Sequence, residues 1–193
     1  MKILFIGFGN VAKEMARIFT EKNLYPALDI SPEVIGIFTG RHGGLENSEG
    51  IGLNTVLAEL RQNNRLAADE SELSPLTPLE AAEKLDYDVL VELSALSIRG
   101  RGEPAASHIR AALKRGKSVA SANKGPVSFR YGELRDLAEK NGALYLFESA
   151  VMDGAPLFSL CRRCMKGATV RGFSGILNGT TNFILSHMEE GGS

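Results

Sequence analysis

The chain has 193 residues, of which 44% are hydrophobic and 23% charged, as in a globular protein with one sizeable core and room for the start of a second. Its formal net charge of −1 gives no reason to expect nucleic acid or an anionic membrane as a partner. No apolar stretch is long enough to span a bilayer, and the N-terminal apolar run is too short for a signal peptide. These features predict a cytoplasmic protein.

The segment Lys2–Ala12, KILFIGFGNVA, predicts a strand, a glycine turn and the start of a helix in direct succession. Such a turn can bind a diphosphate, because its backbone N–H groups point outward and the helix dipole favours negative charge. Gly7 permits the turn and Gly9 lets the backbone approach the phosphates, while Ala12 allows close helix–strand packing. The position after a strand favours a dinucleotide site over an ordinary strand-to-helix turn. The helix is expected to place four residues on one face: Val11, Met15, Ile18 and Phe19.

A second strand is expected at Val34–Phe38, after a loop at Asn23–Pro32. An acidic residue just past this strand would bind the ribose 2′-hydroxyl of NAD, but the chain continues with TGRH, which holds no acid. Arg41 could instead pair with a 2′-phosphate through charge-assisted hydrogen bonds. This pattern favours NADP over NAD, with a solvated surface arginine as the alternative.

The alternation of helices and strands with short links then continues, which predicts a Rossmann-like, doubly wound parallel sheet. Thr77, Pro78 and Glu80 mark a helix start, with a threonine cap, a proline at the first position and a glutamate three residues after the cap. The expected segments, in order, are a glycine-rich loop at Gly43–Gly52, helices at Leu53–Gln62 and from Thr77 to about Leu85, a strand at Asp88–Leu93, a helix at Glu103–Arg115, a strand at Ser118–Ser121, a helix at about Phe129–Asn141 and a strand at Ala143–Phe147.

The pattern changes from Ser149. Pro156 is expected to open a helix that runs to Met165, a longer strand follows at Thr169–Leu177, and helical spacing returns after Asn178. These few elements do not make a closed core. We therefore expect an NAD(P)-binding Rossmann domain over residues 1–150 and the beginning of an α+β catalytic and dimerisation domain, incomplete, over residues 151–193.

Two residues stand where ligands bind in open parallel sheets, at the carboxyl ends of strands. Ser94, followed by Ala95, is expected to touch the cofactor on its nicotinamide side or at its diphosphate. Lys124 follows the strand Ser118–Ser121 on a short, stiff turn. Next to a nicotinamide, a lysine can pass protons or stabilise the charge developing on a carbonyl oxygen. The alternative is a surface lysine on a turn.

Four segments carry a family resemblance and occur in one order: GFGNVA, GEPAASHIRAALKRGKSVASANKGP, FESAVMDGAP and GILNGTTNFIL. Together they resemble homoserine dehydrogenase, and the resemblance covers essentially the whole chain. The motifs ANKGP and GILNGTTN are far more specific than the glycine turn. The resemblance implies an oxidoreductase of threonine and methionine biosynthesis that interconverts L-homoserine and L-aspartate 4-semialdehyde with NADP or NAD.

The resemblance also implies roles for individual residues. The lysine of the family's NK motif is catalytic and lies near the cofactor, and Lys124 matches it. The family's GILNGTTN segment lies near the cofactor and the substrate and matches Gly175–Asn182. With the glycine turn and the strand ends, the candidate cofactor-binding residues are Gly7, Phe8, Gly9, Asn10, Val11, Arg41, Ser94, Ala95, Asn123 and Lys124.

Members of the family also bind a monovalent cation, usually sodium, largely through main-chain carbonyls. The resemblance maps this site onto Glu148, Val151, Asp153 and Ala155. This sequence has Met152-Asp153 where the family more often has a glycine pair, and an acid there could strengthen cation binding or alter the choice of ion.

The family's second catalytic lysine and the acids that hold the amino acid lie downstream of GILNGTTN and are not in this chain. The family's second domain also builds the dimer, so a homodimer is expected only when that domain is complete. A chain ending at Ser193 is expected to expose apolar surface meant for that domain. Two other interpretations stay open: a truncated, non-catalytic NAD(P)-binding module or redox sensor, and a related amino-acid dehydrogenase with another substrate.

Overall fold

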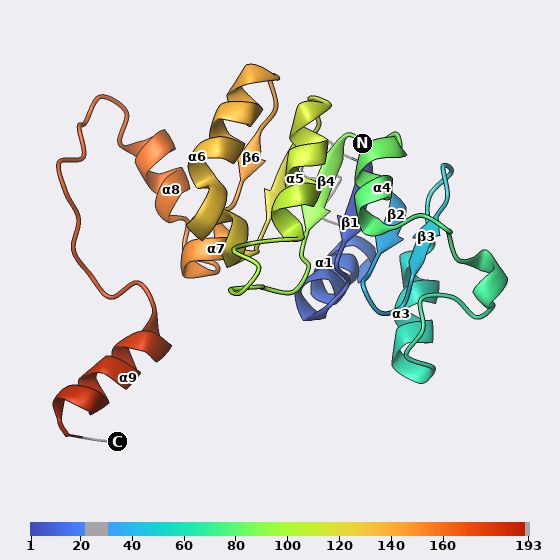
Figure 1. The fold of residues 1–193 in the computed structure, drawn as a ribbon, viewed down its shortest axis with the longest axis horizontal. Helices are drawn as coiled ribbons and strands as arrows, with labels where there is room; N and C mark the ends of the chain where they lie inside the picture. The colour runs from blue at the N-terminus through green and yellow to red at the C-terminus, as the bar shows by residue number, and fades with distance from the viewer. Residues whose placement is uncertain (22–30, 192–193) are drawn as a thin grey trace. The chain divides into compact units, whose positions relative to one another are not determined.

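The computed structural model describes residues 1–21 and 31–191, so most of the predicted loop at 23–32 lies outside the described residues. The chain divides into two compact units, Met1–Phe147 and Glu148–Ser193, and each is described by itself (Figure 1). All candidate cofactor residues belong to the first unit, and the four candidate cation ligands belong to the second.

A six-stranded sheet forms the centre of the first unit, with strands β1 (Lys2–Ile6), β2 (Glu33–Phe38), β3 (Gly44–Glu46), β4 (Val89–Glu92), β5 (Ser118–Ser121) and β6 (Tyr145–Leu146). The strand order is β3-β2-β1-β4-β5-β6, and all neighbours pair in parallel except β3, which is antiparallel to β2. The order reverses at the carboxyl ends of β1 and β4, where open sheets bind ligands. The predicted Rossmann-like sheet is confirmed.

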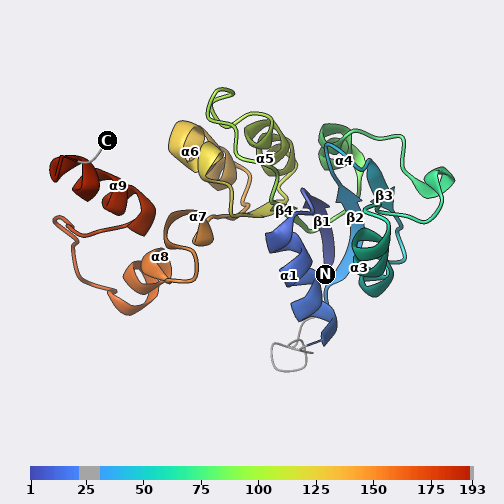
Figure 2. The same ribbon diagram turned by 90° about the horizontal axis from the view of Figure 1, so that it is seen from below.

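Helices cover both faces of this sheet: α1 (Asn10–Glu21), α3 (Leu53–Gln62), α4 (Pro78–Lys84), α5 (Ala105–Lys114) and α6 (Lys124–Lys140), with a short 3-10 helix at Glu70–Glu72. Figure 2 shows α4, α5 and α6 along one face and α1 and α3 along the other. Within each layer, α1 packs against α3, and α5 packs against both α4 and α6. The capping box predicted at Thr77 and Glu80 is present at the start of α4.

The inner face of α1 differs from the predicted one. Ala12 and Ala16 are completely buried, and Met15 and Phe19 pack against the same core cluster. The small alanine side chains let the helix lie close to the sheet, as expected for the third position of the glycine motif. Val11 is 58% exposed, so its predicted place on the inner face is wrong. It projects instead from the start of the helix, beside the glycine turn.

Three further segments of the described chain differ from the prediction. The loop at Gly43–Gly52 contains the edge strand β3, because Gly44 lets the backbone lie against the Phe38 ring, which any Cβ would overlap. α6 begins at Lys124 rather than near residue 129, since a proline in the first helical turn gives up an N–H that has no helical partner. The segment Thr169–Leu177 forms no strand, and no described strand lies paired with it.

The second unit contains α7 (Ser149–Met152), α8 (Leu157–Ser159), a π-helix (Leu160–Cys164) and α9 (Gly179–Glu189). Pro156 precedes α8, and the helix predicted after Asn178 is present as α9, which Asn178 caps by accepting the N–H of Thr181 at 2.8 Å. Over residues 166–191 no side chain is buried, and the large apolar residues Phe173 and Phe183 are 84% and 70% exposed. Among the described helices, none is long and apolar enough to cross a membrane.

Candidate cofactor site

The glycine turn after β1 is fixed between two neighbouring strands. Gly7 donates its N–H to the Phe38 carbonyl at the end of β2, at 2.8 Å, and Leu93 donates its N–H to the Ile6 carbonyl at 2.7 Å. Gly7 has φ of +88°, and a Cβ there would overlap the backbone of Leu93 and Ser94. Both the backbone conformation and the space therefore require glycine. As a result the turn is held against the carboxyl ends of β2 and β4.

The next glycine faces open space. A Cβ at Gly9 would meet nothing within 4 Å, and Gly9, Asn10 and Val11 are all exposed. The Gly9 carbonyl accepts the N–H of Lys13 at 2.9 Å, so the amides of Asn10 and Val11 come before the helical ladder of α1. The first turn of α1 contains no acidic residue. Open space, backbone amides that precede the helical ladder and the positive end of the helix dipole together fit a diphosphate.

Phe8 and Ser94 differ in what they can present to a ligand. The Phe8 side chain is buried edge-on against Phe5, with ring centroids 5.7 Å apart, so only its backbone can face a ligand. Ser94 donates both its N–H, at 3.2 Å, and its hydroxyl proton to Oε1 of Glu92. The hydroxyl oxygen of Ser94 is therefore oriented to accept a hydrogen bond from a ligand rather than to donate one. Ala95, the next residue, is exposed.

Asn123 joins the end of β4 to the start of α6. Its buried side chain donates from Nδ2 to the Ser94 carbonyl at 3.0 Å, and its Oδ1 accepts the Gly125 N–H at 3.1 Å. Lys124 is the first residue of α6 and is exposed, so the predicted stiff turn is in fact a capped helix start. The loop before α5 lies against this point, since a Cβ at Gly102 would come within 2.9 Å of the Gly125 carbonyl carbon.

These contacts bring the sequence-predicted residues into one continuous strip along the carboxyl edge of the sheet. Gly7 lies against the backbone of Ser94, Ser94 is hydrogen-bonded to Asn123, and Lys124 follows directly. On its other side, Gly7 is hydrogen-bonded to the end of β2, whose loop carries Arg41. The strip therefore runs from Arg41 through the glycine turn to Lys124.

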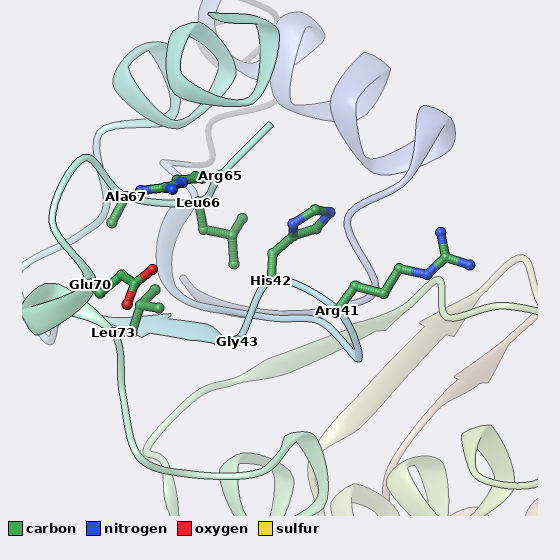
Figure 3. Close-up of a pocket in the computed structure, with 8 residues that line it drawn as sticks. All are labelled: Arg41, His42, Gly43, Arg65, Leu66, Ala67, Glu70 and Leu73. Atoms are coloured by element: carbon green, nitrogen blue, oxygen red, sulfur yellow. The ribbon is translucent and has the colours of Figure 1, made fainter. Parts of the chain in front are cut away.

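Arg41 lies beside a cavity of about 260 Å³ at the end of β2. The loop is held by Thr39, whose Oγ1 accepts the His42 N–H at 2.8 Å and whose N–H donates to the Gly43 carbonyl at 2.9 Å. In Figure 3 the Arg41 side chain extends away from the other lining residues, and Arg65 lies on the opposite side of the cavity. The Arg41 side chain is exposed and can reach a ligand at this edge.

Glu92 is the residue beneath this strip to which the sequence reasoning gave no role. Its side chain is completely buried, and its Oε1 lies 3.7 Å from Nδ1 of buried His108. Burial, together with the negative charge of Glu92, raises the pKa of Tyr145 above its usual range. The available signal was a carboxylate at the end of an otherwise apolar strand, where a buried charge needs partners.

The candidate cation residues lie together in the second unit, but Glu148 already has protein partners there. Its carboxylate accepts the N–H groups of Phe158 at 2.6 Å and Ser159 at 3.0 Å, and the Ser159 hydroxyl at 2.8 Å. Burial by itself would raise the pKa of Glu148, but these hydrogen bonds outweigh it and lower the pKa. Glu148 therefore holds the start of α8 in this structure.

The main chain of the predicted cation segment is also partly engaged. The Ala155 carbonyl accepts the N–H of Leu157 at 2.9 Å, and the Val151 N–H donates to the Glu148 carbonyl at 3.3 Å. Asp153 has φ of +51°, a region that favours glycine, the residue more usual in this pair. Within residues 1–21 and 31–191, no group of three or more His, Cys, Asp or Glu residues is arranged to hold a metal ion. A site made of main-chain carbonyls stays a prediction.

Two family models match the chain. The model described as the NAD-binding domain of homoserine dehydrogenase matches residues 7–148, and a second, described as homoserine dehydrogenase, matches residues 156–193. The first match spans every strand of the sheet except β1 and includes the whole strip from Arg41 to Lys124.

Curated relatives carry the same name. A homoserine dehydrogenase of Methanocaldococcus jannaschii is 29% identical over 192 residues, which cover 100% of this chain and 57% of the relative. An NAD(+)-dependent homoserine dehydrogenase of Pseudomonas canavaninivorans is 32% identical over 199 residues, which cover 98% of this chain and 54% of the relative. The chain thus spans about half the length of the curated relatives it matches.

Solved structures agree in fold. A hyperthermophilic archaeal homoserine dehydrogenase in complex with NADPH aligns with a TM-score of 0.81 at 28% identity, over 100% of this chain and 57% of that chain. A putative homoserine dehydrogenase from Archaeoglobus fulgidus aligns with a TM-score of 0.78 at 30% identity, over 98% of this chain and 55% of that chain. With a family model covering most of its length and a sheet of the same kind, the chain belongs to the homoserine dehydrogenase family.

Proposed function

We propose that this chain supplies the cofactor-binding part and one catalytic lysine of an enzyme that interconverts L-homoserine and L-aspartate 4-semialdehyde with NADPH or NADH. The observation that carries the proposal is the continuous strip at the carboxyl edge of the sheet, in which Gly7 contacts Ser94 and Ser94 is bonded to Asn123. The strip lies at the point where the strand order reverses, where dinucleotides bind in this fold.

The glycine turn is proposed to hold the diphosphate. Gly7 fixes the turn, Gly9 leaves open space for the phosphates, and the amides of Asn10 and Val11 donate to them. Ser94 offers an acceptor oxygen beside the turn, which suits a ribose hydroxyl or a carboxamide N–H. These residues orient the cofactor along the strip, with its nicotinamide toward Lys124.

Lys124 is proposed to act on the substrate oxygen. A bound nicotinamide cofactor supplies the hydride in the reducing direction. The hydride is added to the aldehyde carbon and a proton to the aldehyde oxygen, which gives the hydroxyl of homoserine. The Lys124 ammonium, placed at the start of α6 and exposed, would hydrogen-bond to that oxygen and stabilise its developing negative charge.

Arg41 is proposed to select NADP. The loop after β2 carries no carboxylate that could bind a ribose 2′-hydroxyl, whereas Arg41 is exposed at its tip. The relatives do not decide the question, because one is NAD(+)-dependent by name and one was solved with NADPH. The pocket for the amino acid and the homodimer are proposed to need sequence corresponding to the remaining part of those longer relatives.

The first test is calorimetric titration of this polypeptide with NADPH and NADH, with homoserine turnover assayed on the same sample. Binding of either cofactor supports the proposal, and a folded sample that binds neither contradicts it. Binding without turnover is the expected result, because residues 166–191 bury no side chain that could form a closed substrate pocket.

The role of Lys124 is tested by the nicotinamide emission of bound NADPH. Lys124→Ala should change that emission, because the ammonium group is proposed to lie beside the ring. Lys140→Ala is the matched control, since Lys140 is an exposed lysine at the other end of the same helix. Equal emission from both variants and the wild type would contradict the placement of Lys124.

A further inference from the structure

We propose that Glu92 is a positioning residue of the cofactor site, which fixes Ser94 and Asn123 through a closed ring of buried hydrogen bonds. The inference rests on the proposed function, because it assumes that the nicotinamide half of a dinucleotide binds over Ser94 and the start of α6. The ring consists of Glu92, Ser94, Ser121 and Asn123, and is called the Glu92 ring below.

The place of Glu92 in the sheet makes it unusual. It is the last residue of β4, its register partners are Ile6 of β1 and Ser121 of β5, and no part of its side chain is exposed. Directly paired residues in a sheet point to the same face, so Glu92 and Ser121 lie side by side. This face is the one covered by α5, because Glu92 lies 3.7 Å from His108 of that helix. A carboxylate at the centre of a sheet is costly unless hydrogen bonds satisfy it.

The hydrogen bonds around Glu92 close into a ring. Oε1 accepts the N–H and the hydroxyl of Ser94, and Oε2 accepts the Ser121 hydroxyl at 3.4 Å. The Ser121 oxygen in turn accepts the N–H of Asn123 at 3.1 Å. Asn123 completes the ring by donating from Nδ2 to the Ser94 carbonyl at 3.0 Å. Four residues from the ends of two neighbouring strands are thus held by one another.

An acceptor-only group suits this position. All three protein groups that bond to Glu92 are donors, so both of its carboxyl oxygens act as acceptors in these hydrogen bonds. Because the Ser94 hydroxyl proton points down to Glu92, its oxygen lone pairs are directed away from the carboxylate. Asn123, held by Ser121, caps α6 and thereby sets where Lys124 begins the helix. The ring therefore fixes two features that the proposed site presents to a cofactor.

Two other titratable side chains surround the carboxylate on this face. His108 of α5 lies with its Nδ1 3.7 Å from Oε1 and is buried. Tyr145 of β6 is buried too, and its hydroxyl finds no hydrogen-bond partner among the described residues. Glu92 itself is completely buried, so it can act on a bound cofactor only through Ser94 and Asn123.

The experiment compares two ligands by isothermal titration calorimetry on the whole chain. NADPH carries the nicotinamide and its ribose, whereas 2′-phospho-ADP lacks both and keeps the adenosine half and the diphosphate. Glu92→Gln keeps the shape but turns one acceptor into a donor opposite Ser121, and Ser121→Ala removes a single hydroxyl from the ring. For both variants we expect the Kd for NADPH to rise roughly tenfold, and the Kd for the fragment to stay within about twofold of the wild type.

Tyr87→Phe is the matched control. It also removes one buried hydrogen bond, from the Tyr87 hydroxyl to the Ala82 carbonyl at 2.7 Å, but it lies outside the strip. Tyr87→Phe should lower the free energy of unfolding and should not change the ratio between the Kd for NADPH and the Kd for the fragment. This control distinguishes a positioning effect from general loosening of the sheet, which would weaken both ligands alike.

Several outcomes would overturn the inference. The first applies when the wild type binds NADPH. If both variants then show wild-type Kd values for NADPH and for the fragment, Glu92 does not position the site. Equal loss for both ligands would assign Glu92 a structural role alone. Should Glu92→Gln fail to fold, Ser121→Ala decides the question in the same way. A folded wild type that binds neither NADPH nor NADH would instead refute the proposed function. If it binds NADH alone, NADH and ADP replace the two ligands.

Discussion

The two glycines of the turn give opposite predictions, and the pair separates folding from binding. Gly7→Ala places a Cβ at φ of +88°, where it overlaps the backbone of Leu93 and Ser94. The left-handed conformation costs about 1–2 kcal/mol and the overlap roughly 1–3 kcal/mol, so the free energy of unfolding should fall by about 2–5 kcal/mol. That loss is a large part of the roughly 5–15 kcal/mol that stabilises a typical domain.

Gly9→Ala is the control for Gly7→Ala. Its Cβ would meet nothing within 4 Å, so stability should change by about 1 kcal/mol or less, the cost of alanine at a helix cap. The same Cβ would occupy the space proposed for the diphosphate, and the Kd for NADPH should rise at least about tenfold, or 1.4 kcal/mol. Urea denaturation measures the first effect and calorimetric titration the second. Equal stability of the two variants would refute the overlap argument, and wild-type affinity in Gly9→Ala would refute the diphosphate site.

Three further predictions concern charge. Arg41→Ala should weaken NADPH roughly 10- to 100-fold in calorimetry, because a charge-assisted hydrogen bond is lost, and should leave NADH unchanged; equal loss for both would contradict selection by Arg41. Burial raises the pKa of Tyr87 from 10.0 to about 12, so the stability this phenol contributes is present below its unfolded pKa and lost as the pH rises toward 12. Across that alkaline range, the urea midpoint should fall less steeply with pH in Tyr87→Phe than in the wild type. The same pH dependence in both proteins would contradict the role of the Tyr87 phenol. The lowered pKa of Glu148 means that its carboxylate stabilises the second unit above its ordinary pKa of 4.5 and loses this effect as the pH falls. The protection factors of the Phe158 and Ser159 amides, which correct for the pH dependence of intrinsic hydrogen exchange, should then fall on acidification in the wild type and show no such step in Glu148→Gln.

The sequence was informative wherever local chemistry decides structure. The glycine turn and the Thr77 capping box follow from patterns within a few residues of one another, and the parallel sheet follows from the alternation of helices and strands. The start of α6 was missed, because Gly125-Pro126 indicates a turn unless the Asn123 cap is recognised and the proline is allowed in the first helical turn. Knowing that cap changes the interpretation of Lys124 from a loop residue to the first residue of a helix.

Tertiary pairing explains the remaining differences. β3 forms because Gly44 fits against the Phe38 ring of the neighbouring strand, a contact that the glycine-rich loop sequence does not reveal. Thr169–Leu177 has a strand-like pattern, yet a strand needs a partner, and none of the described strands pairs with it. Glu92 has no local motif at all, since its partners Ser121 and Asn123 come from the neighbouring strand end.

The two edges of the sheet bear on how copies of this chain can associate. β3 at one edge has three residues and β6 at the other has two. An unpaired edge recruits another chain through its row of backbone N–H and C=O groups, and short edges offer few of them. Growth of the sheet from one molecule into the next is therefore disfavoured at both ends. Contacts between copies are expected to use side chains of helices and loops, which can be matched more specifically than a bare backbone edge.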